Sequence, residues 1–507
     1  MQPFVGCNHL LTMNQKLKLA FLLVGLTAIT QAFSQSITAT IYDAETKEPL
    51  PFCTVGIEGK STGTVANAEG KFILGSESLS SGDILVINHI GYEIYKKPAS
   101  ETKSEIYLQQ VSISLNEISI YSKDLSAKDI IEKIEENFEA NHPSVNEKQR
   151  IFLHEFERAK MPGKDRITIN ESDFEGLDPE VIQELIDKLP NQFVEYKDAL
   201  VEFYHHDKET KLVPIDAISL EEQSMMDLAS EMEEQFKDFG ENIKESVKNE
   251  DQYFKFQTGI LSFKADIDTT NEDRPDSIQF QNNSDFWKSS IKAYQKRFAH
   301  VNSDYWEFIT KPGKYRYTKG EVTIINDELV YQIDFKPKSG GLFEGTIYCS
   351  TSTYGVLQVD YHFASGKSDE NFQLLGIGHS IENIGARVIY EHTKEGYLLK
   401  YINAHEQESA SIERSLTFKR KEKRFMWDKT LNRLNMDLEM NFNISSQVEL
   451  LVMDRTALTS EDYNAVEQPE KFTVRKEISN SPDIWKNQTV LAPSSELSKY
   501  QRADAGK

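Results

Sequence analysis

"GKSTGTVANAEGKFILG", residues 59–75, decides the fold of the N-terminal part of this 507-residue chain. Gly59, Gly63 and Gly70 permit backbone conformations with positive φ, and Asn67 tolerates the same region. The run that follows, "KFIL", is typical of a β-strand. The stretch therefore combines turns and strands and shows no obvious reactive side chain. We expect it to be scaffold, with any chemistry located elsewhere in the chain.

The residues on both sides continue the strand pattern. "SITATIYDA" alternates between apolar and polar residues, and "PFCTVGI" places Cys53, Val55 and Ile57 on one face. Pro49 and Pro51 bracket the entry to that strand, which favours an edge position in the sheet. Further strands are expected in "DILVINHIGYEIY", "SEIYLQQ" and "LNEISIYS". Short strands with turn signals at this spacing predict a β-sandwich over residues 36–122.

Three blocks of this region carry a family resemblance. "IYDAETKEPLPFCTVGIEGKSTGTVANAEGKFIL", "GDILVINHIGYE" and "LNEISI" resemble, in this order, the carboxypeptidase regulatory-like domain. The resemblance implies a seven-stranded transthyretin-like β-sandwich, common in bacteroidete-type cell-envelope proteins, that serves as a non-catalytic folding or interaction module. The same domain precedes many TonB-dependent receptors. Fewer than 400 residues follow Tyr121 and the chain ends in hydrophilic residues, so we do not expect that arrangement here.

The first residues have the features of a cleaved secretory signal. These are basic residues, an apolar core and small residues before the cut, namely Lys16, Lys18, Leu19–Ile29, Ala32 and Ser34. We expect residues 1–34 to be removed before Gln35, with Met13 as the true start. No later stretch has eighteen consecutive apolar residues, so no transmembrane helix is predicted. The protein is expected to be exported, in the periplasm or associated with the outer membrane.

Composition limits the classes of partner. Hydrophobic residues make up 39% of the chain, enough for real cores, and the length predicts two to four domains. The formal net charge is −24. So acidic a surface repels phosphate backbones, and nucleic-acid binding is not expected.

Beyond the sandwich, the pattern divides the chain into three further parts. Residues 123–300 look mixed α/β, with helices after Ser126 and after Asp178 and a longer helix over residues 220–247. Residues 301–455 read as one large antiparallel sheet, curved and half-barrel-like, built from successive hairpins. Residues 456–507 are polar, and we expect a loosely attached tail. The fold class is therefore multi-domain and mainly β.

Histidine and glutamate residues at metal-ligand spacing are the first candidates for chemistry. A zinc carboxypeptidase uses His-x-x-Glu with a distant histidine, all converging on one metal ion. Four pairs match this spacing: His154 with Glu157, His379 with Glu382, His392 with Glu395, and His405 with Glu408. Glutamate is so abundant that chance matches are expected. In a strand, residues three apart also point to opposite faces.

Other motifs are weaker still. His205 and His206 adjoin Asp207, and neighbouring strand residues face apart, so an exposed loop end is favoured. The carboxylates of Asp266 and Asp268 suggest a calcium loop, but Asn271 and Ser277 occupy the positions where an EF-hand needs glycine and glutamate. "DSI" at residues 276–278 resembles an O-glycosylation site, and "GKS" at residues 59–61 lacks the earlier glycine of a phosphate-binding loop.

Two cysteines remain after the expected cleavage. Cys53 and Cys349 each lie in an alternating pattern typical of a strand. A disulfide between them is possible in an oxidising compartment, but small buried hydrophobic residues are the favoured interpretation.

We assign no catalytic, cofactor-binding or metal-binding residue from the sequence. The favoured hypothesis is a non-enzymatic binding or structural module of the cell envelope. Its C-terminal sheet, if concave, would take a lipid or a hydrophobic peptide. One alternative is a cryptic, metallopeptidase-like hydrolase. The other is an accessory partner of an outer-membrane TonB-dependent transporter, which would use sandwich edges for strand addition.

Overall fold

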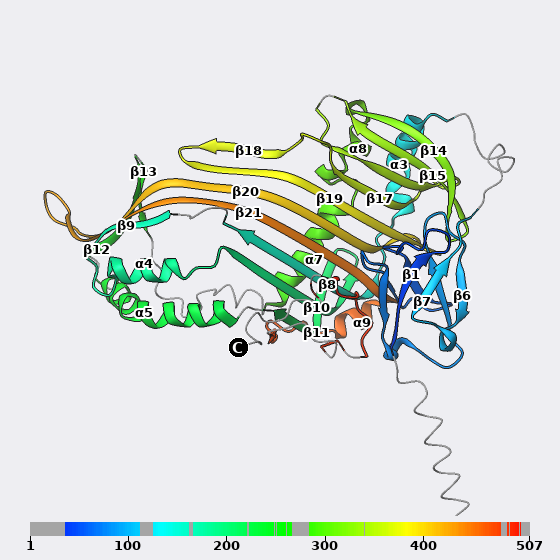
Figure 1. Ribbon diagram of the computed structural model, residues 1–507, viewed down its shortest axis with the longest axis horizontal. Coiled ribbons are helices and arrows are strands. Elements are labelled where there is room, and N and C mark those ends of the chain that lie inside the picture. Colours follow the sequence, from blue (N-terminus) through cyan, green and yellow to red (C-terminus); the bar gives the residue numbers. More distant parts are fainter. Residues whose placement is uncertain are drawn as a thin grey trace, which may run out of the picture. The chain divides into compact units, whose positions relative to one another are not determined.

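The chain forms two compact units. A computed structural model (Figure 1) describes residues 36–111, 125–161, 166–220, 223–247, 249, 251–259, 261–265, 283–338, 340–477, 484–485, 487–495 and 497. The first unit comprises residues 1–111 with 481–495, and the second comprises residues 112–480 with 496–507. The expected signal segment, the strand in "LNEISIYS" and the motifs at residues 266–278 lie outside the described residues.

The first unit is the β-sandwich predicted from the sequence. One sheet has the order β4-β1-β7 and the other the order β3-β2-β5-β6. The strands are β1 (Ile37–Asp43), β2 (Thr54–Ile57), β3 (Gly63–Val65), β4 (Lys71–Leu74), β5 (Ile84–Asn88), β6 (Tyr95–Pro98) and β7 (Glu105–Leu108). Alternation along β2 buries Cys53, Val55 and Ile57 on one side, where they pack with Phe72 in the core. The described strands number seven, as expected.

The position of β2 corrects one sequence prediction. β2 lies between β3 and β5 and is therefore an interior strand, not an edge strand. Pro49 and Pro51 precede its first residue, Thr54, so their missing N–H groups take nothing from the ladder. The prolines shape the approach to the strand without affecting its pairing.

The C-terminal residues of the first unit correct a second sequence prediction. Residues 487–495 were expected to be a loose tail, but Val490 forms an antiparallel bridge with Ile73 of β4. Thr489 and Val490 are 1% and 2% exposed. The Gly75 N–H donates to Thr489 Oγ1 at 2.9 Å, and Thr64 Oγ1 donates to the Val490 carbonyl at 3.2 Å. This segment is an integral part of the sandwich.

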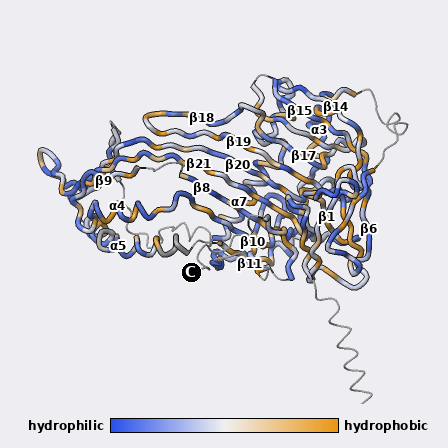
Figure 2. The backbone as a smooth tube through the Cα atoms, viewed as in Figure 1, coloured by the Kyte–Doolittle hydropathy of each residue, from blue (hydrophilic) through white to orange (hydrophobic). Residues whose placement is uncertain are grey.

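The second unit is built on one sheet of fifteen described strands. Its main path runs β14-β15-β16-β17-β19-β20-β21-β8-β10-β11-β22, and β9, β12, β13 and β18 pair beside it. These strands are β8 (Glu147–Lys160), β9 (Arg166–Ser172), β10 (Gln192–His206), β11 (Glu209–Leu220), β12 (Gln252–Thr258), β13 (Leu261–Ala265), β14 (Tyr315–Ile325), β15 (Glu328–Pro337), β16 (Phe343–Ser350), β17 (Val356–Phe363), β18 (Asp369–Leu374), β19 (Ile377–Thr393), β20 (Gly396–Glu422), β21 (Lys429–Ala457) and β22 (Arg475–Glu477). Hydrophobic residues are interspersed among hydrophilic ones along β20 and β21 (Figure 2), and residues 450–453 of β21 form an unbroken apolar run.

Helices cover one face of this sheet and fill the expected hollow. They are α3 (Ala127–Asn141), α7 (Ser284–Phe298) and α8 (Glu307–Thr310), the last with the 3₁₀ turns η3 (Asp304–Trp306) and η4 (Pro312–Lys314) beside it. Trp287, Trp306 and Phe308 are fully buried against sheet residues such as Phe335 and Phe343. The apolar face is therefore mostly packed core, and α7 is a helix that the sequence analysis did not predict.

The far ends of β20 and β21 form an extended arm, defined here as residues 406–446. β9 and β12 pair with it, β13 pairs with β12, and α4 (Pro179–Asp187) and α5 (Gln223–Val247) lie along it (Figure 1). A small core holds them together, with Phe174, Phe254 and Leu434 buried and Phe236 of α5 packed against them. In the part of the chain that the structure describes, no helix is both long and apolar enough to cross a membrane.

The expected division at residue 300 is not a boundary between compact units. Strands β8 and β10, from the part read as mixed α/β, pair with each other, and β8 pairs with β21 across fourteen register positions. β22, from the expected tail, pairs with β11. Such pairings join segments far apart in sequence, which local periodicity cannot reveal.

Candidate functional site

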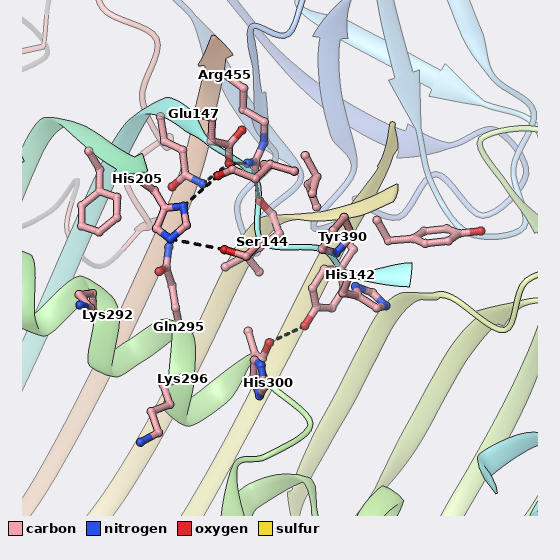
Figure 3. A pocket seen from close by; sticks show the side chains of 18 of the residues that line it. His142, Ser144, Glu147, His205, Lys292, Gln295, Lys296, His300, Tyr390 and Arg455 are labelled. Atoms are coloured by element: carbon pink, nitrogen blue, oxygen red, sulfur yellow. Dashed lines mark hydrogen bonds and ion pairs between the residues drawn. The ribbon is translucent and has the colours of Figure 1, made fainter. Parts of the chain in front are cut away.

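A pocket of about 370 Å³ opens in the second unit where α3 and α7 meet the sheet (Figure 3). Its walls come from the end of α3, the link to β8, the start of β8, the end of β10, helix α7 and strands β19 to β21. Apolar and aromatic side chains form much of the wall, namely Phe138, Val145, Phe203, Ala299, Tyr390, Tyr397, Leu398 and Leu399. Histidines and charged residues complete it, namely Glu139, His142, Glu147, His205, Lys292, Lys296, His300 and Arg455.

His142 closes one end of the pocket. It is the C-cap of α3, and Pro143 stops the helix there. Its ring stacks on Phe138 with centroids 4.2 Å apart and meets Tyr390 edge-on at 4.5 Å. Nε2 accepts the Val356 N–H at 3.1 Å. Burial lowers the pKa of His142 to about 3, so this ring is neutral at physiological pH.

Ser144 and His205 form the nucleophile-like pair of the site. His205 Nδ1 lies 2.9 Å from the Val145 carbonyl oxygen, and its Nε2 lies 3.4 Å from Ser144 Oγ. A carbonyl only accepts, so Nδ1 carries the proton and Nε2 is the acceptor for the serine hydroxyl. The orienting group of this histidine is a main-chain carbonyl, where hydrolase triads use a carboxylate.

Glu147 and Arg455 form a buried ion pair at the inner wall. Arg455 donates from Nη1 to Glu147 Oε1 and from Nη2 to the Leu399 carbonyl, and Gln149 Nε2 donates to Glu147 Oε1 at 2.6 Å. The side chain of Arg455 is 11% exposed and that of Glu147 is 9% exposed. Burial lowers the pKa of Arg455, although Glu147 opposes that shift. The arginine charge is thus neutralised within the wall.

Two lysines mark the solvent side. Lys292 and Lys296 are exposed residues of α7, one turn apart, and both line the pocket. Gln295 lies between them on the same helix. These two positive charges exceed the one negative charge of exposed Glu139 in the same lining, in a chain whose net charge is −24.

The lining is suited to binding a small molecule with an apolar body and an acidic group. Among the described residues, no group of three or more histidine, cysteine, aspartate or glutamate side chains converges in a way that could hold a metal ion. Several polar groups of the inner wall are paired with each other: Tyr390 OH, for example, donates to the Ala299 carbonyl at 2.7 Å. The inner wall therefore presents chiefly apolar surface to a ligand.

The histidine pairs singled out from the sequence have other partners. His154 Nδ1 lies 2.5 Å from Asp198 Oδ1, directly across the β8–β10 ladder, and not against Glu157. Burial alone would lower the pKa of His154, but the Asp198 carboxylate raises it overall. This buried pair is a structural contact within the sheet.

The remaining three pairs are likewise separate. His379 Nε2 contacts Glu408 at 3.0 Å, and His392 Nδ1 contacts Glu328 at 2.9 Å. His405 packs against Gly385, and burial, together with the nearby ring of His362, lowers its pKa. Glu408 lies on β20, next to the strand of His379, and Glu328 lies on β15, so neither ion-pair partner is the glutamate three residues away in sequence.

The two adjacent histidines do diverge, as expected for a strand. His205 turns toward Ser144, whereas His206 contacts Ser460 Oγ at 2.9 Å and stacks on Tyr463. Both are half-buried at the end of β10, so the expectation of an exposed loop end is wrong. Cys53 and Cys349 are free and fully buried, each in the core of its own unit.

Of the pocket residues, the sequence analysis weighed His205 alone as a candidate site residue. α3 ends at Asn141, just before Pro143, and this end places His142 in the wall. Lys292 and Lys296 lie four residues apart, the spacing that places two side chains on one face of a helix. This signal can be used only after residues 284–298 are recognised as a helix. Glu147 and Arg455 lie 308 residues apart, and no local pattern connects them.

Comparisons with known proteins concern the first unit. Residues 37–120 match the family model of the CarboxypepD_reg-like domain. Over 103 residues, 20% of this chain, the sequence is 32% identical to the TonB-dependent receptor SusC of Bacteroides thetaiotaomicron. The match spans 10% of the length of that receptor, so most of it has no counterpart in this alignment. Together with strands β1 to β7, the family match identifies the N-terminal part of the chain as a carboxypeptidase regulatory-like domain with a transthyretin-like sandwich fold.

Proposed function

We propose that this chain is an exported, non-enzymatic ligand-binding protein of the cell envelope, and that its pocket holds a small anionic amphiphile. The regulatory-like domain and the similarity to an envelope receptor of a Bacteroides species support the location. The observation that carries the binding role is the pocket itself, which joins an apolar interior to a cationic mouth.

The size and lining favour a short alkyl chain with a carboxylate or phosphate head. The volume of about 370 Å³ is at the small end of the range for ligand sites. Each methylene that leaves water contributes about 0.8 kcal/mol against the apolar wall. Lys292 and Lys296 supply the positive charge that an acidic head requires.

A hydrophobic peptide fits the interior less well. Its main-chain N–H and C=O groups would need partners inside the pocket. Glu147 with Arg455, His205 with Val145, and Tyr390 with Ala299 already bond to one another. An alkyl chain makes no such demand, and we therefore favour a lipid-like ligand.

The test is binding of decanoate by the purified chain, followed by calorimetry, beside mass spectrometry of lipid extracted from the protein as purified. Gln295→Trp fills the pocket from α7 and is expected to abolish binding. Lys292→Gln with Lys296→Gln is expected to weaken it about tenfold. The matched control, Lys338→Gln with Lys394→Gln, removes two exposed lysines elsewhere and should bind as wild type. Unchanged binding by Gln295→Trp would refute the pocket as the site.

Hydrolysis is a second candidate function, favoured by one observation. The Ser144–His205 pair has the tautomer that accepts a proton from the serine. If Ser144 is a nucleophile, a fluorophosphonate probe labels the wild-type chain and not Ser144→Ala. Equal or absent labelling of both proteins would exclude this role for Ser144. The match to the receptor reflects a shared domain and does not by itself favour a partnership with such a transporter.

A further inference from the structure

The tip of the arm exposes three large apolar side chains in succession. Phe425, Met426 and Trp427, in the turn between β20 and β21, are 103%, 69% and 80% exposed. The turn is nevertheless tied down, because Asp428 accepts hydrogen bonds from Tyr253 OH at 2.6 Å and from the Arg424 N–H at 3.4 Å. Consecutive apolar side chains held in water by an ordered turn indicate a surface that is covered in use.

A row of basic residues crosses the arm just behind this tip. In the strand register, Lys264 of β13 lies opposite Lys255 of β12, Lys255 opposite Lys419 of β20, and Lys419 opposite Arg433 of β21. Directly opposed residues project from the same face of a sheet, and like charges in such positions destabilise it. We call these four residues the basic row. Its cost to the fold indicates a role in contacting an anionic partner.

The surroundings of the basic row only partly compensate its charge. Lys419 Nζ donates to Gln257 Oε1 at 2.9 Å, and Glu171 lies 4.0 Å from Arg433 Nη1. Burial lowers the pKa of Lys419, and repulsion from Arg433, Lys255 and Lys421 lowers it further. A lowered lysine pKa is expected where several cations lie close together.

The basic row lies on the face of the arm opposite its small core. Side chains alternate along β20, so Phe418 and Lys419 point to opposite faces. Phe418 stacks on Phe254, with centroids 5.3 Å apart, in the core covered by α4 and α5. Arg420, on the Phe418 side, donates to Ser246 of α5 at 2.6 Å. The face with the basic row carries no such helix among the described residues.

Local charge and shape favour a lipid surface over a protein. Residues 419–433 contain seven basic and two acidic residues in a chain of net charge −24. Aromatic residues flanked by Lys and Arg are typical of segments at the membrane interface. A stable protein interface buries about 800 Å² per partner, more than a short turn offers. Five residues separate Lys419 from Phe425, about 20 Å along a strand, so the basic row reaches the headgroups together with the tip when the arm lies obliquely on the bilayer.

We propose that the tip of the arm inserts into the interface of a bilayer with anionic headgroups, and that the basic row contacts those headgroups. This docking surface is separate from the pocket and does not depend on a ligand there. Phe425, Met426 and Trp427 enter the apolar boundary, while Lys255, Lys264, Lys419 and Arg433 remain at the level of the phosphates.

Co-sedimentation of the full chain with vesicles tests this. Binding is expected to phosphatidylcholine vesicles that contain phosphatidylglycerol, and to weaken as salt is added. Phe425→Ser with Trp427→Ser is expected to weaken binding about tenfold or more. Lys255→Gln, Lys264→Gln and Lys419→Gln together are expected to do the same and to flatten the salt dependence. Neither set removes a buried apolar side chain, and unfolding midpoints near that of wild type will verify that both fold.

Matched controls separate the arm from the rest of the chain, including its N-terminal apolar segment. Tyr107→Ser with Ile215→Ser removes two exposed apolar residues elsewhere, and Lys103→Gln, Lys208→Gln and Lys394→Gln remove three exposed lysines. Both should bind as wild type. Equal losses in control and arm variants would overturn the proposal, as would equal binding to vesicles of phosphatidylcholine alone.

Tryptophan quenching supplies a second readout. Trp287 and Trp306 are fully buried, whereas Trp427 is 80% exposed. Brominated lipid mixed with phosphatidylglycerol is expected to quench part of the wild-type emission and to have little effect on Trp427→Phe. Equal quenching of the two proteins would contradict insertion of the tip. Failure to bind vesicles, with cross-linking of residues 423–428 to an envelope protein, would assign the surface to a protein partner instead.

Discussion

Glu307 shows how one buried charge can hold several elements of this fold together. Its side chain is 5% exposed and accepts hydrogen bonds from Lys314 Nζ at 2.8 Å, Tyr315 OH at 2.6 Å and the Leu342 N–H at 2.9 Å. Burial by itself would raise the pKa of Glu307, but these three donors together lower it below its ordinary value. The ionised carboxylate thus links α8, η4, β14 and the residue before β16.

We expect replacement of the Glu307 carboxylate to cause a loss of stability that depends on pH. The folded-state pKa of Glu307 is depressed, so its stabilisation is complete above the unfolded-state pKa and is lost as the pH falls through the folded-state value. Glu307→Gln is expected to lower the free energy of unfolding by about 2 kcal/mol at neutral pH, with the gap shrinking below about pH 4. Urea titrations followed by tryptophan emission measure this difference in the free energy of unfolding.

The control for this prediction is Glu321→Gln, an exposed carboxylate on β14 in the same unit. It should leave the free energy of unfolding within about 0.5 kcal/mol of wild type. A Glu307→Gln deficit that persists unchanged into acid would show that size and shape, not charge, matter at this site.

At the scale of elements, α3 illustrates a helix whose start is set locally and whose end helps to build the pocket. Ser126 and Asp129 form a capping box, with the Asp129 N–H donating to Ser126 Oγ at 3.2 Å and the Ser126 N–H to Asp129 Oδ2 at 2.9 Å. Ile130, Ile134 and Phe138 face the sheet. The helix thereby holds His142 at the pocket.

Ser126→Ala is expected to lower the free energy of unfolding of the second unit by about 1 kcal/mol, because an N-terminal N–H of α3 loses its acceptor. Chemical denaturation measures the change. Ser289→Ala, at an exposed interior position of α7, should be neutral or slightly stabilising because alanine has the higher helix propensity. Equal losses in the two variants would argue against a capping role.

The bridge between Val490 and Ile73 yields a prediction about how the C-terminal segment stabilises the first unit. Thr489 Oγ1 accepts the Gly75 N–H and lies 2.8 Å from Ser78 Oγ. A Cβ at Gly75 would stand 2.3 Å from the Gln488 carbonyl carbon. Thr489→Val leaves the buried Gly75 N–H without a partner and is expected to cost about 2 kcal/mol, whereas Thr489→Ser keeps the hydroxyl.

Gly75→Ala is expected to displace residues 487–493 and expose them to protease, since backbone atoms cannot yield to the added methyl group. Limited proteolysis with mass mapping detects the cleavage. Gly82→Ala is the control for proteolysis without crowding, because no atom lies within 4 Å of its added Cβ, although its positive φ adds local strain. Protection of residues 487–493 in Gly75→Ala would show that the segment tolerates the change.

At the scale of the whole molecule, the residues that the structure describes form two separate large cores. Phe72 and Leu85 lie in the core of the first unit, and Trp287, Trp306 and Phe335 lie in that of the second. Units with their own cores can unfold as separate cooperative units. Charge is also unevenly distributed, with the basic segment 419–433 in a strongly acidic chain.

Phe72→Ala is expected to destabilise the first unit by about 3–5 kcal/mol through loss of apolar burial and the cavity left behind. In calorimetry, we expect one transition to move to lower temperature while the other keeps its midpoint. With Trp485 of the first unit replaced by phenylalanine, emission from Trp287 and Trp306 should follow the transition that does not move. A shift of both transitions by the same amount would show that the units unfold together.

Sequence patterns predicted most of the local structure and little of the site. The sandwich, the capped start of α3 and the antiparallel hairpins of the large sheet follow from alternation and turn chemistry within a few residues. α7 was missed, because its mixed polar and aromatic residues give a weak period.

The sequence by itself determined where strands turn and helices start, because these choices depend on backbone propensities of adjacent residues. Tertiary structure alone decided that β8 pairs with β21, that residues 487–495 join the sandwich, and that Ser144, His205, Lys292 and Arg455 line one pocket. Those relations unite segments tens to hundreds of residues apart. They are fixed by the burial of apolar faces and by pairing of backbone groups across the whole sheet, and no local stretch encodes either.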